Sequence, residues 1–192
     1  MKKILFTLLF SSCTILASAQ EDTTNKDDAN NKFQVHSITI SPVGVYASSA
    51  SAGFGANADL AFNYGENVFK IYANGGSEFV ISTFGEPIYD SYEEYGLLFG
   101  RTIQIKNKVN FDYFAGLSYF KYTSNNNSSA SEYDNYYEPN DEESEEKVIG
   151  LPLQAKIRFD TGRIFSLGLQ FHVNINTATT ILQPGLFLQW KL

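Results

Sequence analysis

Residues 54–64 read Phe-Gly-Ala-Asn-Ala-Asp-Leu-Ala-Phe-Asn-Tyr, and this stretch decides the fold class. Every second position, from Phe54 to Tyr64, is apolar. The positions between them are small or polar and include Asn57 and Asp59. Successive side chains of a β-strand point to opposite faces, so the stretch predicts a strand with one apolar and one polar wall.

The same alternation recurs in seven further segments on both sides of this strand. In one of them it changes phase at Pro42, which predicts a β-bulge there. Each segment is long enough for a tilted membrane strand, which needs about 9–11 residues. We therefore predict an all-β fold, an eight-stranded antiparallel up-and-down transmembrane barrel. The predicted strands are residues 36–46, 54–64, 68–81, 95–106, 109–122, 148–159, 164–176 and 181–192.

The connections between these strands alternate between short and long. Residues 65–67, 107–108 and 160–163 are short and rich in turn-forming residue types. Between them fall the longer connections 47–53, 82–94, 123–147 and 176–180. Short turns on a periplasmic rim and longer loops on the opposite rim are typical of outer-membrane barrels.

The N-terminus predicts export. Two lysines precede an apolar run over residues 4–10, and Ala17-Ser18-Ala19 forms a cleavage site of the A-x-A type. We therefore predict a signal peptide over residues 1–19, cleaved near Ala19, a disordered polar leader over residues 20–32 and a barrel over residues 33–192. The alternative, acylation of Cys13, is disfavoured because apolar residues follow it and lead to the cleavage site.

Composition limits the possible functions. Cys13 is the only cysteine and lies in the predicted signal peptide, so the mature chain has no disulfide or thiol chemistry. Without the signal peptide the chain has 12 basic and 21 acidic residues, a formal charge of −9. The charge of such an acidic chain disfavours nucleic-acid binding, because phosphate binding needs an excess of Lys and Arg. We expect no cofactor and no metal site.

Alternation by itself does not say whether the apolar wall faces lipid or an internal ligand. Two patterns favour lipid. Aromatic residues gather near both ends of the strands, with aliphatic residues between them, as in membrane barrels. The polar wall has few charges, and these balance, which suits an interior of paired groups. The predicted aromatic girdle at the short-turn rim is Tyr64, Phe69, Phe111, Phe159, Phe165 and Trp190, and the predicted interior polar network is Asp59, Lys70, Asp112, Lys156, Arg158 and His172.

One charge departs from this pattern. By parity Arg101 faces lipid, where a charge at mid-depth costs about 2–4 kcal/mol. Either it lies near the rim and extends to water, or a bulge near Gly100 turns it inward. The residues leave both alternatives open.

Two short stretches resemble known outer-membrane sequences. Gln183-Pro-Gly-Leu-Phe-Leu-Gln-Trp190 resembles the C-terminal signal read by the barrel assembly machinery, although Lys191-Leu192 follow the aromatic residue. Residues 148–156, Val-Ile-Gly-Leu-Pro-Leu-Gln-Ala-Lys, are similar to a strand of the outer-membrane β-barrel domain family, which includes small porin-like barrels of the OmpA and OmpX type. The resemblance implies the fold and an outer-membrane location. Its implied partners are outer-membrane lipid and the assembly machinery, and the family is functionally mixed.

Three functional classes compete. An open pore is disfavoured, because side chains fill a barrel of about eight strands. An enzyme acting on outer-membrane lipid is disfavoured, because His172 faces the lumen and no nucleophile–base pair is visible. A soluble periplasmic barrel that binds an apolar ligand inside is the remaining alternative.

The third long connection is the most distinctive segment. Eight acids fall between Glu132 and Glu146, with three tyrosines among them. Three interpretations are open: a solvated mobile loop, a contact surface for an extracellular protein or glycan, and weak cation capture. We predict a monomeric, non-enzymatic barrel with a structural or surface-interaction role through such loops. The candidate binding residues are Glu132, Tyr133, Asp134, Tyr136, Tyr137, Glu138, Asp141 and Glu142.

Overall fold

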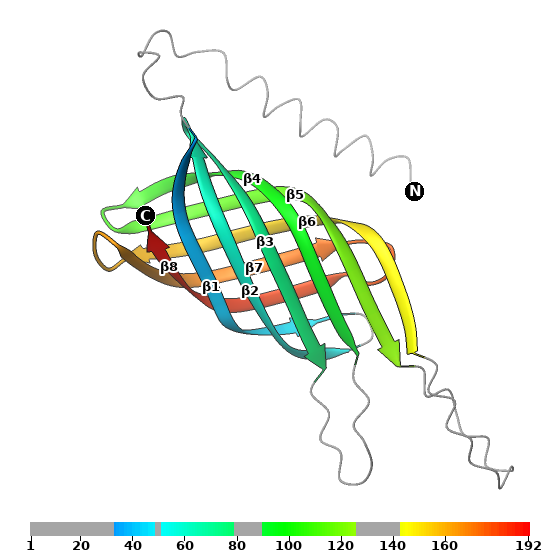
Figure 1. The fold of residues 1–192 in the computed structure, drawn as a ribbon. Helices are drawn as coiled ribbons and strands as arrows, with labels where there is room; N and C mark the ends of the chain where they lie inside the picture. The colour runs from blue at the N-terminus through cyan, green and yellow to red at the C-terminus, as the bar shows by residue number, and fades with distance from the viewer. Residues whose placement is uncertain (1–32, 49–50, 79–89, 126–142) are drawn as a thin grey trace, which may run out of the picture. The chain divides into compact units, whose positions relative to one another are not determined.

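The computed structural model describes residues 33–48, 51–78, 90–125 and 143–192. Eight antiparallel strands form a closed barrel in which each strand pairs with its neighbours in sequence and β8 pairs with β1 (Figure 1). The fold class and the number of strands are therefore as predicted. The strands are β1 (Gln34–Ala47), β2 (Ala52–Tyr64), β3 (Asn67–Glu78), β4 (Ser91–Lys106), β5 (Val109–Asn125), β6 (Glu143–Asp160), β7 (Phe165–Ile175) and β8 (Ile181–Lys191).

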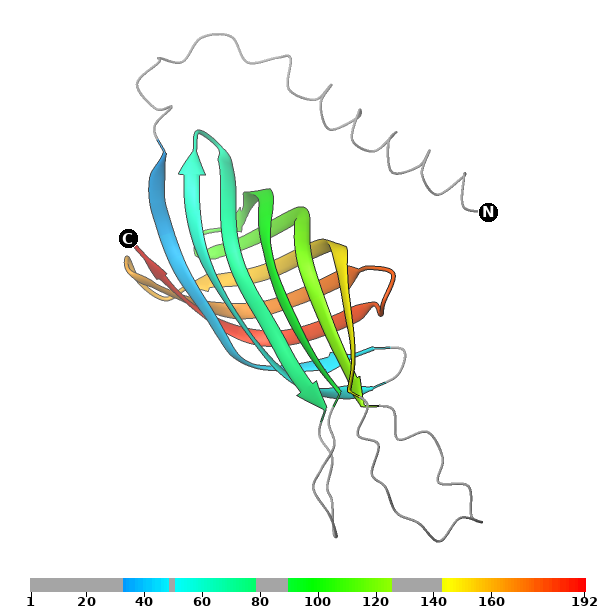
Figure 2. The same cartoon turned by 45° about the vertical axis from the view of Figure 1, so that its right-hand side comes forward.

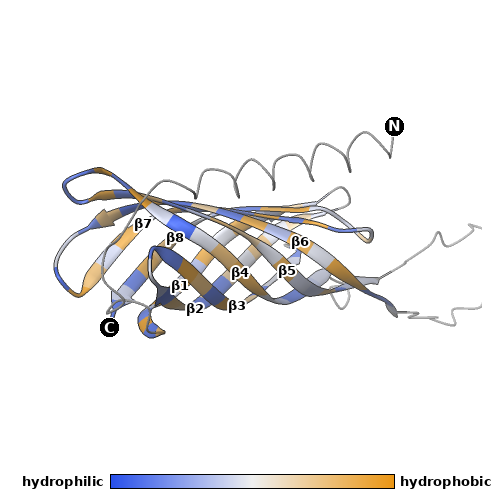
Figure 3. Cartoon of the chain, turned by 90° about the horizontal axis from the view of Figure 1, so that it is seen from above, coloured by the Kyte–Doolittle hydropathy of each residue, from blue (hydrophilic) through white to orange (hydrophobic). Residues whose placement is uncertain are grey.

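The alternation in the sequence becomes the inside and the outside of the barrel. In β2, buried and exposed residues alternate from Ala52 to Asp59. The exposed set is aliphatic in the middle of the strands, as at Leu97 and Ile149, which are 63% and 68% exposed. Hydrophobic and hydrophilic positions alternate along the ribbon (Figure 3). The apolar wall therefore faces outward and the polar wall faces the lumen.

The strands are strongly tilted (Figure 2). Following register partners once around the barrel from Asn67 in β3 leads to Ser77, a stagger of ten residues along the same strand. This stagger ties strand tilt to barrel width, and a barrel of about eight strands is just wide enough for side chains to fill. Residues that meet across the lumen are therefore far apart in sequence.

The short connections gather at one rim. Gly65 and Lys108, at the β2–β3 and β4–β5 turns, have φ angles of 59° and 78°. Glycine adopts such angles without steric cost, and Lys108 adopts one because a turn this tight needs it. The first strand begins and the last strand ends at this same rim, where Leu192 N donates to the carbonyl of His36 at 3.0 Å.

The predicted bulge at Pro42 is confirmed. The β1–β2 register shifts between Ser41 and Gly44, and the β1–β8 register shifts between Ile40 and Val43. Pro42 and Val43 are both exposed, so two consecutive side chains face outward at the bulge. This shifts the alternation by one residue, and Gly44 and Tyr46 point into the lumen.

Five strands, β1, β2, β4, β5 and β6, are longer than the sequence predicts. β4 begins at Ser91 rather than at residue 95. β5 ends at Asn125 and β6 begins at Glu143, so both strands extend into the predicted loop 123–147. The predicted signal peptide and leader lie outside the described residues. None of the residues that the structure describes forms a helix long and apolar enough to cross a membrane.

Candidate functional site: the filled lumen and the loop-side rim

A charge layer crosses the lumen nearer the short-turn end. Asp59 Oδ2 in β2 accepts a hydrogen bond from Lys156 Nζ in β6 at 2.6 Å, and Lys70 Nζ in β3 lies 3.6 Å from the same oxygen. Lys70 also donates to Gln154 Oε1 at 3.1 Å and lies 3.7 Å from the ring centroid of Phe114. Buried charges are tolerated when they are paired and hydrogen-bonded.

A second set of charges lies closer to the short-turn rim. Arg158 Nη2 lies 3.4 Å from Asp112 Oδ1, and Lys191 Nζ lies 2.8 Å from Asp160 Oδ1. Arg158 Nε lies 4.0 Å from Asp160 Oδ1, so the two pairs adjoin. Five of the six residues of the predicted interior network thus lie in two adjoining charged groups, and the sixth, His172, lies elsewhere.

His172 belongs to a separate buried cluster built on Glu94. The Glu94 carboxylate accepts hydrogen bonds from Asn174 Nδ2 at 2.5 Å, from Asn74 Nδ2 at 3.2 Å and from the Tyr72 hydroxyl. His172 Nε2 lies 2.9 Å from Glu94 Oε2. Glu94 and His172 are both 0% exposed. The neighbouring strand β3 and the distant strand β7 therefore supply the polar partners of one carboxylate inside the barrel.

Glu94 is the main site residue that sequence reasoning missed. The sequence predicts it in the loop 82–94, whereas it belongs to β4 and points into the lumen. The signal was present: Tyr92 and Glu94 continue the inward phase of Gly96 and Leu98. The two adjacent acids, Glu93 and Glu94, and the loop-like composition of this stretch hid the alternation.

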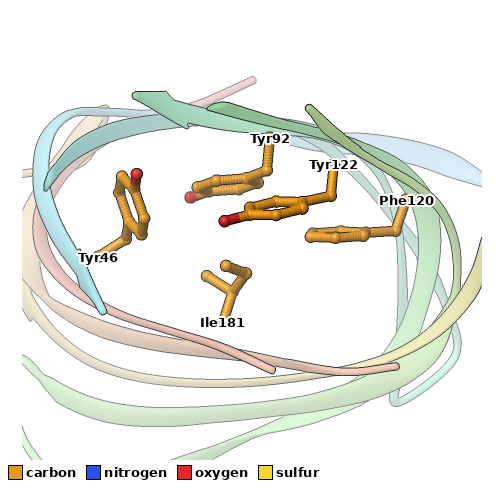
Figure 4. Close-up of a cluster of buried hydrophobic side chains, with 5 residues drawn as sticks. All are labelled: Tyr46, Tyr92, Phe120, Tyr122 and Ile181. Atoms are coloured by element: carbon orange, nitrogen blue, oxygen red, sulfur yellow. The ribbon is translucent and has the colours of Figure 1, made fainter. Parts of the chain in front are cut away.

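An aromatic plug fills the lumen near the long-loop end. We give this name to Tyr46, Tyr92, Phe120, Tyr122 and Ile181, all at most 8% exposed (Figure 4). The rings of Tyr46 and Tyr92 meet edge to face at 5.0 Å, and Tyr92 stacks on Phe120 at 5.8 Å between centroids. Aromatic pairs at these separations add to the stability that burial alone provides.

Inward glycines make room for the plug. A Cβ added at Gly76 would lie 2.6 Å from Tyr92 Cε1 and 2.8 Å from Tyr46 Cδ1, and one added at Gly53 would lie 2.7 Å from Tyr46 Cε1. The plug is also anchored, because the Tyr92 hydroxyl donates to Gln183 Oε1 at 2.9 Å. The plug, the Glu94 cluster and the charge layer therefore close the described lumen at three levels.

The six residues of the predicted girdle lie at the short-turn ends of their strands, on the outer surface or partly exposed. Phe165 and Trp190 meet edge to face at 5.5 Å. Phe33, which precedes β1, joins this ring through contacts with Tyr64 at 5.1 Å and Phe69 at 5.5 Å.

Arg101 lies at the short-turn rim. Its Nε donates to Asn67 Oδ1 at 3.0 Å, and its Nη1 lies 3.7 Å from Glu66 Oε2 at the β2–β3 turn. The β4 register is continuous through Gly100 and Arg101, so no bulge turns the side chain inward. Of the two alternatives, the structure selects the rim position.

At the opposite rim, β5 and β6 form a ribbon that extends well past β7, while β4 stays paired with β5 as far as Thr123. Register pairing of β5 with β6 continues to Asn125 and Glu143, whereas pairing of β6 with β7 stops at Leu151 and Ile175. The ribbon projects at the lower right of Figure 1. It carries residues 126–142, and all eight candidate binding residues lie there, outside the described residues.

Glu145 of β6 forms two ion pairs on the ribbon, one across to Lys121 of β5 and one along its own strand to Lys147. Glu145 lies 2.6 Å from Lys121 Nζ and 2.9 Å from Lys147 Nζ. Hydrogen bonds from Lys121 and Lys147 lower the pKa of Glu145 to about 2, and the same contact raises the pKa of Lys147. No group of three or more metal-ligand side chains occurs among the described residues.

An aliphatic outer wall, aromatic residues near the rims and a filled polar lumen define the transmembrane β-barrel class of the outer membrane. No protein-family model and no curated protein matches the sequence. Among solved structures, the chain is similar to Neisserial surface protein A, with a TM-score of 0.59 and 12% identity over 83% of this chain and 97% of that one.

Two further structures have the same fold. Ail, the attachment invasion locus protein of Yersinia pestis, solved with the heparin analogue sucrose octasulfate, gives a TM-score of 0.51 at 11% identity and covers 83% of this chain and 98% of its own. The N-terminal β-barrel domain of Pseudomonas aeruginosa OprF gives 0.52 at 10% identity, with 83% and 100% covered. Similarity at this level of identity establishes the fold.

Proposed function

We propose that this protein is a small outer-membrane barrel with a closed lumen that binds a partner through its acidic loop-side surface. The carrying observation is the β5–β6 ribbon, which extends past β7 and whose two strands are joined by the acidic, tyrosine-bearing residues 126–142. A barrel with a structural role alone does not need strands of 17 and 18 residues, because about 9–11 cross a bilayer.

Charge indicates the kind of partner. The segment between the ribbon strands adds five acids, Glu132, Asp134, Glu138, Asp141 and Glu142, to a rim that already carries exposed Glu145 and Glu146. Ail was solved with a sulfated heparin analogue, which is anionic, and an acidic surface repels such a ligand. We therefore favour a basic protein surface, with tyrosines as contact residues of low conformational entropy.

The remaining parts of the proposal follow from the outward apolar wall. Outer-membrane lipid contacts the aliphatic band, the C-terminal strand carries the signal for the assembly machinery, and the exported chain is a monomer. The soluble alternative required the apolar wall to line the interior, whereas the described interior is polar and aromatic. The lipid-enzyme alternative gains nothing from His172, which is buried in the lumen against Glu94. The lack of enzyme activity stays a prediction.

Location is tested by extraction and gel mobility. We expect the full chain to sediment with outer membranes, to require detergent for release, and to migrate faster in unheated than in heated gel samples. Recovery in the soluble periplasmic fraction would contradict the proposal.

Partner binding is tested by removing the loop while keeping the ribbon. Because Asn125 and Glu143 are register partners, residues 126–142 can be replaced by Asn-Gly, the preferred two-residue hairpin turn. We expect cells with this deletion to lose at least tenfold in binding of lysozyme, used as a basic protein probe. A variant with the five loop acids changed to Asn or Gln should lose binding equally.

The control is a deletion within residues 79–89, which leaves the ribbon intact and should change binding less than twofold. Heat-modifiable mobility verifies folding of each variant. Undiminished binding by the charge-neutral variant would show that the loop acids do not recognise the partner.

A further inference from the structure

The β4–β5 hairpin extends past β3 at the short-turn rim. Pairing of β3 with β4 ends at Asn67 and Arg101, whereas pairing of β4 with β5 continues to Lys106 and Val109. Within the described part of the chain, residues 102–106 of β4 are therefore paired on one side only, and all of them are exposed. The hairpin thus projects beyond the β2–β3 turn.

The outer face of this hairpin is apolar. Ile103 and Ile105 are 51% and 60% exposed, and they continue the outward stripe of Leu97 and Phe99 along β4. Pairing places Phe111 of the aromatic girdle beside Ile103. Large aliphatic side chains are unfavourable in water and favourable in the acyl region of a lipid leaflet. The outer face of the hairpin therefore continues the apolar wall of the barrel.

The tip of the hairpin carries cations. Lys106 and Lys108 are exposed, and neither forms an ion pair with another described residue. The β6–β7 turn lies alongside, because the backbone N–H of Asp160 donates to the carbonyl oxygen of Lys108 at 2.8 Å, and this turn adds the exposed Arg163. The Asp160 carboxylate is already paired with Lys191 at 2.8 Å. This part of the rim therefore presents three cations to an external anion.

Lys108 stands where the turn favours glycine. Its φ of 78° lies in the left-handed region, and the β4–β5 register shifts between Gln104 and Lys106. This combination is typical of a G1 bulge, whose left-handed position is usually glycine because a Cβ is unfavourable there. Every other positive φ among the described residues belongs to glycine. A lysine at this position is held at a backbone cost, which indicates a role for its charge.

We propose that Lys106, Lys108 and Arg163 bind the headgroup of an anionic phospholipid, with Ile103 and Ile105 in contact with its acyl chains. Basic side chains at a membrane surface attract anionic headgroups, and their long stems reach the phosphate from the edge of the acyl region. The site rests on the membrane placement proposed above and is independent of the loop-side partner.

Two properties of the hairpin select a lipid as the anion. The short-turn rim faces the periplasm in barrels of this class, where phospholipid forms the leaflet. The apolar face leads directly to the cations at the tip, which matches the order of acyl chain and headgroup in a phospholipid. An acidic protein would pair with the cations but would leave Ile103 and Ile105 in water.

The test is a titration of phosphatidylglycerol into the refolded full chain in uncharged detergent micelles, followed by amide NMR shifts. We expect saturating shifts at residues 103–108 and at Arg163, with affinity about tenfold or more above that for phosphatidylcholine with the same acyl chains. Glycerol 3-phosphate, which lacks acyl chains, should give no saturating shift. Equal responses to the two lipids, or saturation by glycerol 3-phosphate, would overturn the proposal.

A pair of charge variants assigns the binding to this hairpin. Lys106→Gln/Lys108→Gln should weaken phosphatidylglycerol binding about tenfold, because each lysine near a headgroup adds to the attraction. The matched control, Lys121→Gln/Lys147→Gln, removes two charges at the opposite rim and should leave the affinity close to wild type. Equal affinities in the two variants would contradict the site. Heat-modifiable mobility verifies folding of both variants, and extraction tests the membrane placement separately, so failure of one claim is distinguished from failure of the other.

Discussion

At the scale of single residues, Asp59 is the most consequential charge of the barrel. It is fully buried and is the shared acceptor for Lys156 and Lys70. Removing one partner of a buried ion pair costs about 3–5 kcal/mol, because the other charge stays buried. We therefore expect Asp59→Asn to lower the free energy of unfolding by about that amount, measured by urea titration of the refolded protein.

The control for this prediction is Glu66→Gln. Glu66 faces Arg101 at 3.7 Å, but its side chain is 87% exposed. Surface pairs contribute at most about 1 kcal/mol, so this variant should unfold close to wild type. Equal losses in the two variants would contradict the importance assigned to burial.

Gly76 provides a second test at this scale, on packing. A Cβ there would lie 2.6 Å from the ring of Tyr92 and 2.9 Å from the carbonyl oxygen of Phe54. We expect Gly76→Ala to lower stability by about 1–3 kcal/mol, the usual cost of overpacking, with a changed near-ultraviolet circular dichroism signal from the plug tyrosines. Gly162→Ala, where nothing lies within 4 Å of the added Cβ, should change neither quantity appreciably.

At the scale of elements, the β5–β6 ribbon should respond to pH. The hydrogen bonds from Lys121 and Lys147 lower the pKa of Glu145 from its ordinary value of 4.5 to about 2. A lowered folded-state pKa means that the contribution of Glu145 is present above about pH 4.5 and is lost as pH falls toward about 2.

We therefore expect the protection factors of the amides of residues 121–125 and 143–147, which compare measured hydrogen-exchange rates with the intrinsic rate at each pH, to fall over that pH window. In Glu145→Gln the protection factors should already be lower near neutral pH and should change less below pH 4.5. A pH response identical to wild type in this variant would assign the effect to other carboxylates.

At the scale of the whole molecule, the outer surface sets the depth of the barrel in a bilayer. Trp190 is the only tryptophan and lies at the short-turn end of β8, 37% exposed. We expect its fluorescence to be quenched more by lipids brominated near the headgroup than by lipids brominated near the chain end. The variant Trp190→Phe/Phe171→Trp moves the indole to the outer face in the middle of β7 and should reverse that order.

Permeability is the matching test of the lumen. The plug, the Glu94 cluster and the charge layer lie in series, so we expect liposomes containing the protein to exclude sugars as empty liposomes do. Tyr46→Ala/Tyr92→Ala removes two of the five plug side chains and leaves the other two barriers, so this variant should also exclude sugars. Swelling by the wild-type protein in sugar solutions would show that the lumen is open.

Much of this fold was predictable because the determining information is local. Alternation decides which residues face outward, turn-forming residues mark the short rim, and Pro42 marks a bulge through its missing N–H. Each of these three signals depends only on residues that are close together in the chain. Strand ends were predicted less well, because β4, β5 and β6 continue through polar residues that pair only once the neighbouring strand is present.

The sequence by itself therefore determined the strand count, the two walls of each strand and the inward position of most charges. The tertiary structure alone decided which inward groups meet. Lys156 and Asp59 are 97 residues apart, and His172 and Glu94 are 78 apart. Both contacts depend on closure of the barrel and on the ten-residue stagger of its register, which are collective properties of all eight strands.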